Sequence, residues 1–114
     1  MTIDELQKKI RDLTVGIEHP RVGSALALAL GEECGEVMRC VLDQEYYGKD
    51  IQAALADEVG DVLVALTEVC ERFGISLAAS AEQAVAKIAR KAPQWRAELG
   101  DRLIRLRARM DGPA

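Results

Sequence analysis

The sequence is poor in residues that cross-link a chain or bind soft metals. Its 114 residues include three cysteines, Cys34, Cys40 and Cys70, and a single histidine, His19. No two cysteines form a CxxC pair, which argues against a disulfide framework and a zinc site, so we expect reduced, mostly buried thiols. A di-iron carboxylate bundle normally takes an ExxH motif from each of two helices, and one histidine outside any such motif fits it poorly.

Long hydrophobic runs are also missing. The longest uncharged apolar run covers residues 22–31, about half of the roughly 20 residues that span a bilayer. The N-terminus lacks the pattern of a signal peptide. These absences predict a cytoplasmic protein that makes no contact with a membrane.

The residues that are plentiful indicate a small helical domain. Hydrophobic residues make up 49% of the chain and charged residues 30%, with only 4% aromatics. Such a composition, without any alternating strand pattern, predicts an all-α fold in one domain over residues 1–114. The net charge of −4 is unevenly placed, because residues 1–86 carry 16 acids and 7 bases whereas residues 87–114 carry 3 acids and 8 bases.

Turn and capping signals predict four to five helices. Thr2 and Glu5 form a capping box at the start of the first helix. Gly48 is the expected turn residue after the second helix, and Gly74 the expected C-cap of the third. Pro93 should end or kink the fourth, leaving a basic amphipathic helix from about residue 93. The predicted ranges are 2–15, 22–45, 50–73, from 76 or 77 to about 93, and 93–110, with an interruption at 16–23 and fraying over 111–114.

Two similar acidic stretches lie within the apolar helices, GEECGEV at 31–37 and ADEVGDV at 56–62. At about 100° per residue, Glu33 and Glu58 each fall at the centre of an apolar stripe. Each stripe is bordered by a second acid about 60° away and a third about 100° away, which are Glu36 and Glu32 on one helix and Asp61 and Asp57 on the other. An antiparallel pairing of the two helices would let these clusters face one another.

Such carboxylates need positive charge. A carboxylate removed from water without a partner is costly, and neither acidic segment contains a lysine or arginine. One i, i+3 acid pair is most simply a solvated helix face. Two matching pairs centred on apolar stripes instead favour a hard divalent cation, with Mg²⁺ first and Mn²⁺ as a substitute.

The spacing ExxE, 21 residues, ExxD resembles the MazG-like all-α nucleoside triphosphate pyrophosphohydrolases. Glu33, Glu36, Glu58 and Asp61 carry this pattern, and EECGE fits its fuller EExxE form. The resemblance covers about residues 20–96 and includes the basic segment KIARKAPQW at 87–95. It implies a helical subunit that pairs with another, and hydrolysis of a nucleoside triphosphate between its α and β phosphates to a monophosphate and pyrophosphate.

The resemblance also implies roles for individual residues. The expected metal ligands are Glu33, Glu36, Glu58 and Asp61. The expected catalytic residues are Glu32 and Glu33, with Glu32 orienting or deprotonating the attacking water or holding a further metal; Asp57 either shares that task or is simply solvated. Lys87, Arg90 and Lys91 share one helix face, which is either a phosphate-binding surface or a solvated basic face.

Assembly and alternatives complete the prediction. Gly35 and Gly60 lie on the helix faces opposite the acidic stripes. Glycine in a helix interior costs about 1 kcal/mol relative to alanine, so its use at both positions suggests that another helix approaches closely there. We therefore expect a homodimer or a dimer of dimers that completes the core. A phosphoribosyl-ATP pyrophosphatase-like enzyme would use the same four acids, and a non-enzymatic helical module would use the basic tail to bind nucleic acid or another partner. The second alternative leaves the duplicated acids without a purpose, so nucleic acid is not expected.

Overall fold

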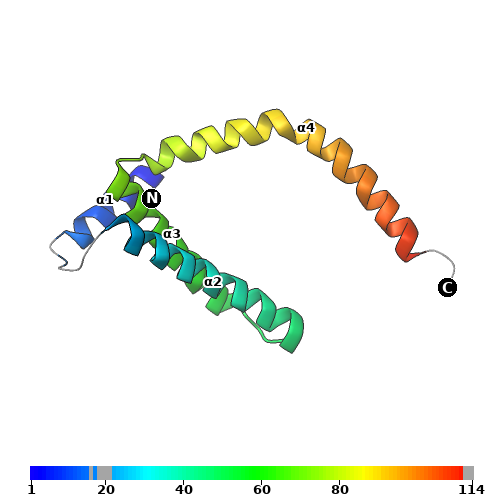
Figure 1. The fold of residues 1–114 in the computed structure, drawn as a ribbon, viewed down its shortest axis with the longest axis horizontal. Helices are drawn as coiled ribbons and strands as arrows, with labels where there is room; N and C mark the ends of the chain where they lie inside the picture. The colour runs from blue at the N-terminus through cyan, green and yellow to red at the C-terminus, as the bar shows by residue number, and fades with distance from the viewer. Residues whose placement is uncertain (16, 18–21, 112–114) are drawn as a thin grey trace. The chain divides into compact units, whose positions relative to one another are not determined.

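The fold is entirely helical in the part of the chain that the structure describes. The structure is a computed structural model and describes residues 1–15, 17 and 22–111. In these ranges it contains four helices and no strand: α1 (Ile3–Thr14), α2 (Gly23–Tyr47), α3 (Gln52–Phe73) and α4 (Leu77–Met110) (Figure 1). The all-α prediction is confirmed. The predicted interruption at 16–23, with His19, and the predicted fraying at 111–114 fall largely outside the described residues.

The helix ends follow the expected capping chemistry. The Thr2 hydroxyl oxygen accepts a hydrogen bond from the Glu5 backbone N–H at 3.1 Å, as an N-cap does. Gly48 and Gly74 have φ angles of 62° and 67°, the left-handed conformation that a residue without a Cβ adopts most easily. Both glycines therefore end their helices at the predicted positions.

The helix α3 begins two residues later than the sequence predicted. The Asp50 carboxylate accepts a hydrogen bond from the Gln52 backbone N–H at 3.2 Å. This bond holds Asp50 in the turn before the helix, because a short acidic side chain competes with helical backbone bonding at such a position.

The prediction of a separate helix from about residue 93 is wrong. Pro93 lies inside α4, which continues without a break to Met110 and curves along its length in Figure 1. Proline in a helix interior costs about 3 kcal/mol relative to alanine. The turns that follow Pro93 contain side-chain pairs that favour helix, Gln94 with Glu98 at 3.0 Å and Arg105 with Asp101 at 2.8 Å. Each such pair contributes about 0.2–0.5 kcal/mol, so the two pairs offset only part of the cost of the proline.

The chain divides into two compact units, an N-terminal unit of residues 1–78 and a C-terminal unit of residues 79–114. In the N-terminal unit, α3 packs against both α2 and α1. The described side chains buried there are Ile10, Leu26, Ile51, Ala65, Cys70, Gln7 and Thr67. Three of them, Leu26, Ile51 and Ala65, belong to the apolar stripes predicted around the two acids. The core of this unit is small.

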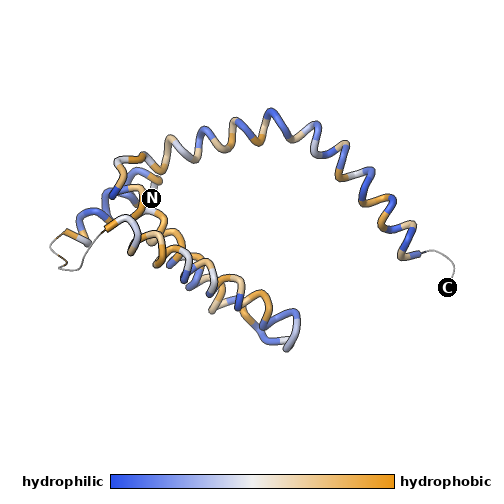
Figure 2. Tube along the Cα trace, viewed as in Figure 1, coloured by the Kyte–Doolittle hydropathy of each residue, from blue (hydrophilic) through white to orange (hydrophobic). Residues whose placement is uncertain are grey.

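No described residue of α4 is buried. Its colours alternate between hydrophilic and hydrophobic along the whole helix in Figure 2, as expected for one apolar side. None of the described helices combines the length and apolar character needed to cross a membrane.

The cysteines are free as predicted, but only Cys70 is buried, whereas Cys34 and Cys40 are half-buried.

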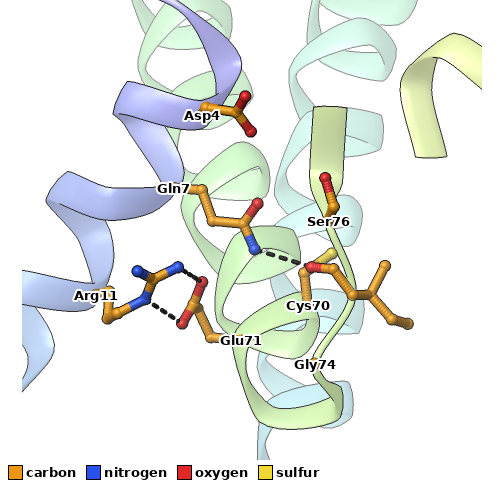
Figure 3. A pocket seen from close by; sticks show the side chains of 8 residues that line it. Asp4, Gln7, Arg11, Cys70, Glu71, Gly74 and Ser76 are labelled. Atoms are coloured by element: carbon orange, nitrogen blue, oxygen red, sulfur yellow. Dashed lines mark hydrogen bonds and ion pairs between the residues drawn. The ribbon is translucent and has the colours of Figure 1, made fainter. Parts of the chain in front are cut away.

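A polar contact anchors α1 to the turn between α3 and α4. The Gln7 amide donates to the Ile75 carbonyl oxygen at 2.9 Å (Figure 3). It also accepts from the Leu77 backbone N–H at 3.0 Å. Arg11 also donates two hydrogen bonds, at 2.7 and 2.9 Å, to the Glu71 carboxylate. Gln7, Arg11, Glu71 and Ile75 belong to the lining of a pocket of about 320 Å³, where these bonds hold the fold together.

Gln7→Ala should destabilise the protein by about 2 kcal/mol. The amide is only 7% exposed, and its loss leaves one backbone carbonyl and one backbone N–H without their partner. Urea unfolding measures the loss. Lys9→Ala, an exposed substitution on the same helix, is the control and should change the free energy of unfolding by less than about 0.5 kcal/mol. Equal effects of the two substitutions would contradict this role of Gln7.

Candidate metal centre

The acidic clusters meet because α2 and α3 form a hairpin. The two helices are joined by residues 48–51 and run side by side in Figure 1. Glu33 on α2 and Glu58 and Asp61 on α3 each place one carboxylate oxygen within 4.8 Å of those of the other two. Glu33 and Glu58 are half-buried and Asp61 is exposed. The structure thus brings together three of the four predicted ligands.

The fourth predicted ligand lies beside this trio but outside the 4.8 Å group. Glu36 is exposed, and its negative charge contributes to raising the pKa of both Glu33 and Glu58. The negative charge of Glu32 also raises the pKa of Glu33, and the charge of Asp57 raises the pKa of both Glu33 and Glu58. All six acids singled out in the sequence therefore belong to one electrostatic cluster.

The cluster raises the pKa values of its two half-buried members. Burial is the largest cause of the raised pKa of Glu33, followed by repulsion from Asp61, Glu36, Glu32 and Asp57. Burial is likewise the first cause for Glu58, followed by Asp61, Glu36, Asp57 and Glu33. Removing a carboxylate from water and placing it beside like charges both disfavour its ionised form.

No basic side chain neutralises this charge in the part of the chain that the structure describes. Its ion pairs join Lys8 to Asp12, Arg11 to Glu71, Lys49 to Asp43 and Arg105 to Asp101. None of them includes an acid of the cluster. The arrangement therefore has the donor atoms and the uncompensated negative charge that a hard divalent cation requires.

A pocket of about 310 Å³ adjoins the trio and includes an acid that the sequence analysis missed. Its lining residues are Ala29, Glu33, Asp61, Val64, Ala65 and Glu68. Glu68 lies seven residues after Asp61, which places it about 20° from Asp61 around α3. That heptad spacing is the signal that could have identified it. Three carboxylates thus line a pocket beside the candidate centre, and this pocket is large enough to hold part of a small ligand.

Cys40 is a second neighbour that the sequence analysis assigned only to the apolar stripe. Burial raises the pKa of its thiol, and the charges of Glu58, Asp43 and Glu36 raise it further. Both effects favour the protonated form of the thiol in the metal-free protein.

The basic residues predicted to bind phosphate lie in the C-terminal unit. Lys87, Arg90 and Lys91 are exposed and share one face of α4 through their i, i+3 and i+4 spacing. Their shared face agrees with the prediction, and their role in binding phosphate stays a prediction.

These features define a class of protein, an all-helical protein with an acidic site on a helical hairpin. The family model of the MazG nucleotide pyrophosphohydrolase domain matches residues 22–96. The chain belongs to this family. Comparisons with curated proteins and with solved structures gave no match. The matched range contains every acid of the cluster and all three predicted phosphate-binding residues.

Proposed function

We propose that this protein is a Mg²⁺-dependent nucleoside triphosphate pyrophosphohydrolase. One observation carries the proposal: Glu33, Glu58 and Asp61 converge within 4.8 Å without a basic partner among the described residues, inside a MazG nucleotide pyrophosphohydrolase domain. The ligands are these three carboxylates together with Glu36, and Mn²⁺ can replace Mg²⁺. Bound Mg²⁺ supplies the positive charge that links an acidic site to the phosphate oxygens of an anionic substrate.

The side chains have distinct tasks in this proposal. Glu33 holds the metal at the centre of the site, and Glu32 accepts the proton of the attacking water. Lys87, Arg90 and Lys91 bind the distal phosphates through charge-assisted hydrogen bonds. One water is consumed as the anhydride between the α and β phosphates breaks, and the products are a nucleoside monophosphate and pyrophosphate.

Product analysis tests the proposal directly. Canonical and modified nucleoside triphosphates, and phosphoribosyl-ATP, are each incubated with Mg²⁺ or Mn²⁺, and pyrophosphate and orthophosphate are quantified. We expect pyrophosphate with a nucleoside triphosphate and no turnover with a chelator. Predominant orthophosphate would contradict the proposed bond cleavage, and turnover of phosphoribosyl-ATP alone would assign the site to that substrate. Salt-sensitive nucleic-acid binding without turnover would indicate an interaction module instead.

We also propose that the protein works as a homodimer or a dimer of dimers. Gly35 and Gly60 were predicted to face a close helix, yet no described atom lies within 4 Å of a Cβ built at either glycine. Leu28, Met38 and Leu42 of α2 are 48–71% exposed in the single chain. A second copy would cover these surfaces. Light scattering at micromolar concentration should give at least twice the mass of one chain, and a monomer would contradict this.

A further inference from the structure

The last part of α4 has an apolar stripe that nothing in the described structure covers. We call residues 99–110 the C-terminal arm; it follows the family match, which ends at residue 96. Leu99, Leu103, Leu106 and Met110 lie within about 40° of one line along the helix. Their side chains are 50–77% exposed. So narrow a stripe, with three- and four-residue spacings, is typical of a helix that packs against another helix.

Covering the stripe requires a further surface. The four apolar residues of the stripe belong to the C-terminal unit, in which no described residue of α4 is buried. Covering such side chains removes apolar surface from water, which is favourable, so the arm has the character of a docking surface for a partner.

The charges beside the stripe show what chemistry this partner has. Arg102, Arg105 and Arg109 follow one side of the stripe and, with Leu106, line a shallow pocket of about 350 Å³. Arg107 lies on the other side. Two arms packed together would bring these arginines close to one another, which disfavours pairing of identical arms. The arm instead fits a surface with large apolar side chains and acids.

The hairpin tip, which we define as residues 42–50, has this chemistry. Leu42, Tyr46 and Tyr47 are 48%, 75% and 75% exposed. The tip also carries Asp43, Glu45 and Asp50 with a single base, Lys49, which lies 4.0 Å from the Asp43 carboxylate. Its net charge is therefore opposite to that of the arm. None of these acids belongs to the candidate metal centre.

We infer that the C-terminal arm of one copy docks on the hairpin tip of a second copy. Leu99, Leu103, Leu106 and Met110 pack against the exposed tyrosines and Leu42, while the arginines pair with the acids of the tip. Each copy has one arm and one tip. In a two-fold dimer the arm of each copy binds the tip of the other, and no arm or tip is left to bind a third copy. This inference does not depend on the proposed activity.

A photoreactive amino acid placed in the arm tests where it docks. Benzoylphenylalanine replaces Leu106 in one sample and Ala108, on the opposite side of the helix, in another. Each full-length protein is mixed as ¹⁴N and ¹⁵N forms, irradiated and digested. We expect mixed-isotope cross-links from position 106 to peptides containing residues 42–50, and none from position 108. Cross-links within one chain, to α4 of the other copy, or equally from both positions would overturn the inference.

Two neighbouring substitutions test the energetics. Leu103→Ser removes a side chain of the stripe, whereas Ile104→Ser removes one that is 68% exposed and lies about 140° away from it. Sedimentation should show dimer dissociation constants raised at least about tenfold by the first and less than about threefold by the second. Arg105→Glu should weaken the dimer in the same way, and Glu45→Arg should partly restore it. Equal effects at 103 and 104, or a monomeric wild type, would overturn the docking.

Binding of the arm elsewhere would be detected separately. Vesicles of anionic lipid and a short duplex DNA are each titrated with the full-length protein at physiological salt. If the arm docks on the hairpin tip, the Leu103→Ser substitution should not change binding to the vesicles or to the DNA. A loss of vesicle or DNA binding in the Leu103→Ser variant, with an unchanged dimer dissociation constant, would assign the stripe to that ligand and overturn the proposal.

Discussion

Glu33→Gln is expected to reduce turnover by at least about 100-fold while stabilising the metal-free protein. The substitution removes a central ligand and therefore weakens Mg²⁺ binding. In the absence of metal it also removes a carboxylate whose pKa is raised by burial and by the neighbouring acids. The charged form of such a group opposes folding, so its neutral replacement should raise the melting temperature of the metal-free protein.

Thermal unfolding with and without Mg²⁺ separates a metal ligand from a structural acid. A cation that binds only the folded state raises its stability by RT ln(1 + [L]/Kd), so the wild type should respond strongly and the weakly binding variant much less. Glu82→Gln, at an exposed acid of α4 outside the acidic cluster, is the control and should retain both turnover and the Mg²⁺ response. A lower melting temperature of metal-free Glu33→Gln, together with an unchanged Mg²⁺ shift, would exclude Glu33 as a ligand.

Acidification is expected to affect the metal-free and metal-bound proteins in opposite directions. Glu33 and Glu58 have folded-state pKa values above the ordinary 4.5. Protonation is therefore easier in the folded state, and the contribution to stability is fully present below pH 4.5 and lost as pH rises through the raised values. Metal-free wild type should thus gain stability relative to the Glu33→Gln/Glu58→Gln variant as pH falls from 7 toward 4.5.

Metal binding should follow the opposite trend, because a carboxylate must lose its proton to bind a cation. Below the raised pKa values of both glutamates, affinity for Mg²⁺ or Mn²⁺ should fall by up to about 100-fold per pH unit, since two protons are displaced. Calorimetric titration at several pH values measures this slope. Affinity that does not fall as pH is lowered through 4.5, or a pH-dependent stability difference of the reverse sign, would contradict the assignment of these two glutamates.

The sequence was sufficient to predict the acidic site because its signals are local and periodic. Thr2, Gly48 and Gly74 determine helix ends through bonds and backbone angles that involve a few neighbouring residues. Glu33 and Glu58 could be placed on facing stripes because a short connection forces consecutive helices to pack side by side. Asp61 joins them because it follows Glu58 by three residues, about one turn, on the same helix.

Other features depend on several weak effects or on neighbours distant in sequence. The helix continues through Pro93 although proline disfavours a helix interior, and residue type alone does not reveal this outcome. The raised pKa of the Cys40 thiol depends partly on Glu58, which belongs to the other helix of the hairpin. Glu68 lines the pocket because α3 runs beside α2, although Glu68 lies outside the ExxD motif.

The anchoring of α1 shows that residues outside the family match contribute to the stability of the fold. The family match begins at residue 22, yet Gln7 and Arg11 bind the end of α3 and the turn that leads into α4. A chain shortened to the matched residues would keep every acid of the cluster. It would also leave the backbone groups of Ile75 and Leu77 without the Gln7 side-chain amide and uncover the side of α3 that meets α1. The first helix therefore braces the helix that carries Glu58 and Asp61, and losing it would lower the stability of the fold without removing any acid of the cluster.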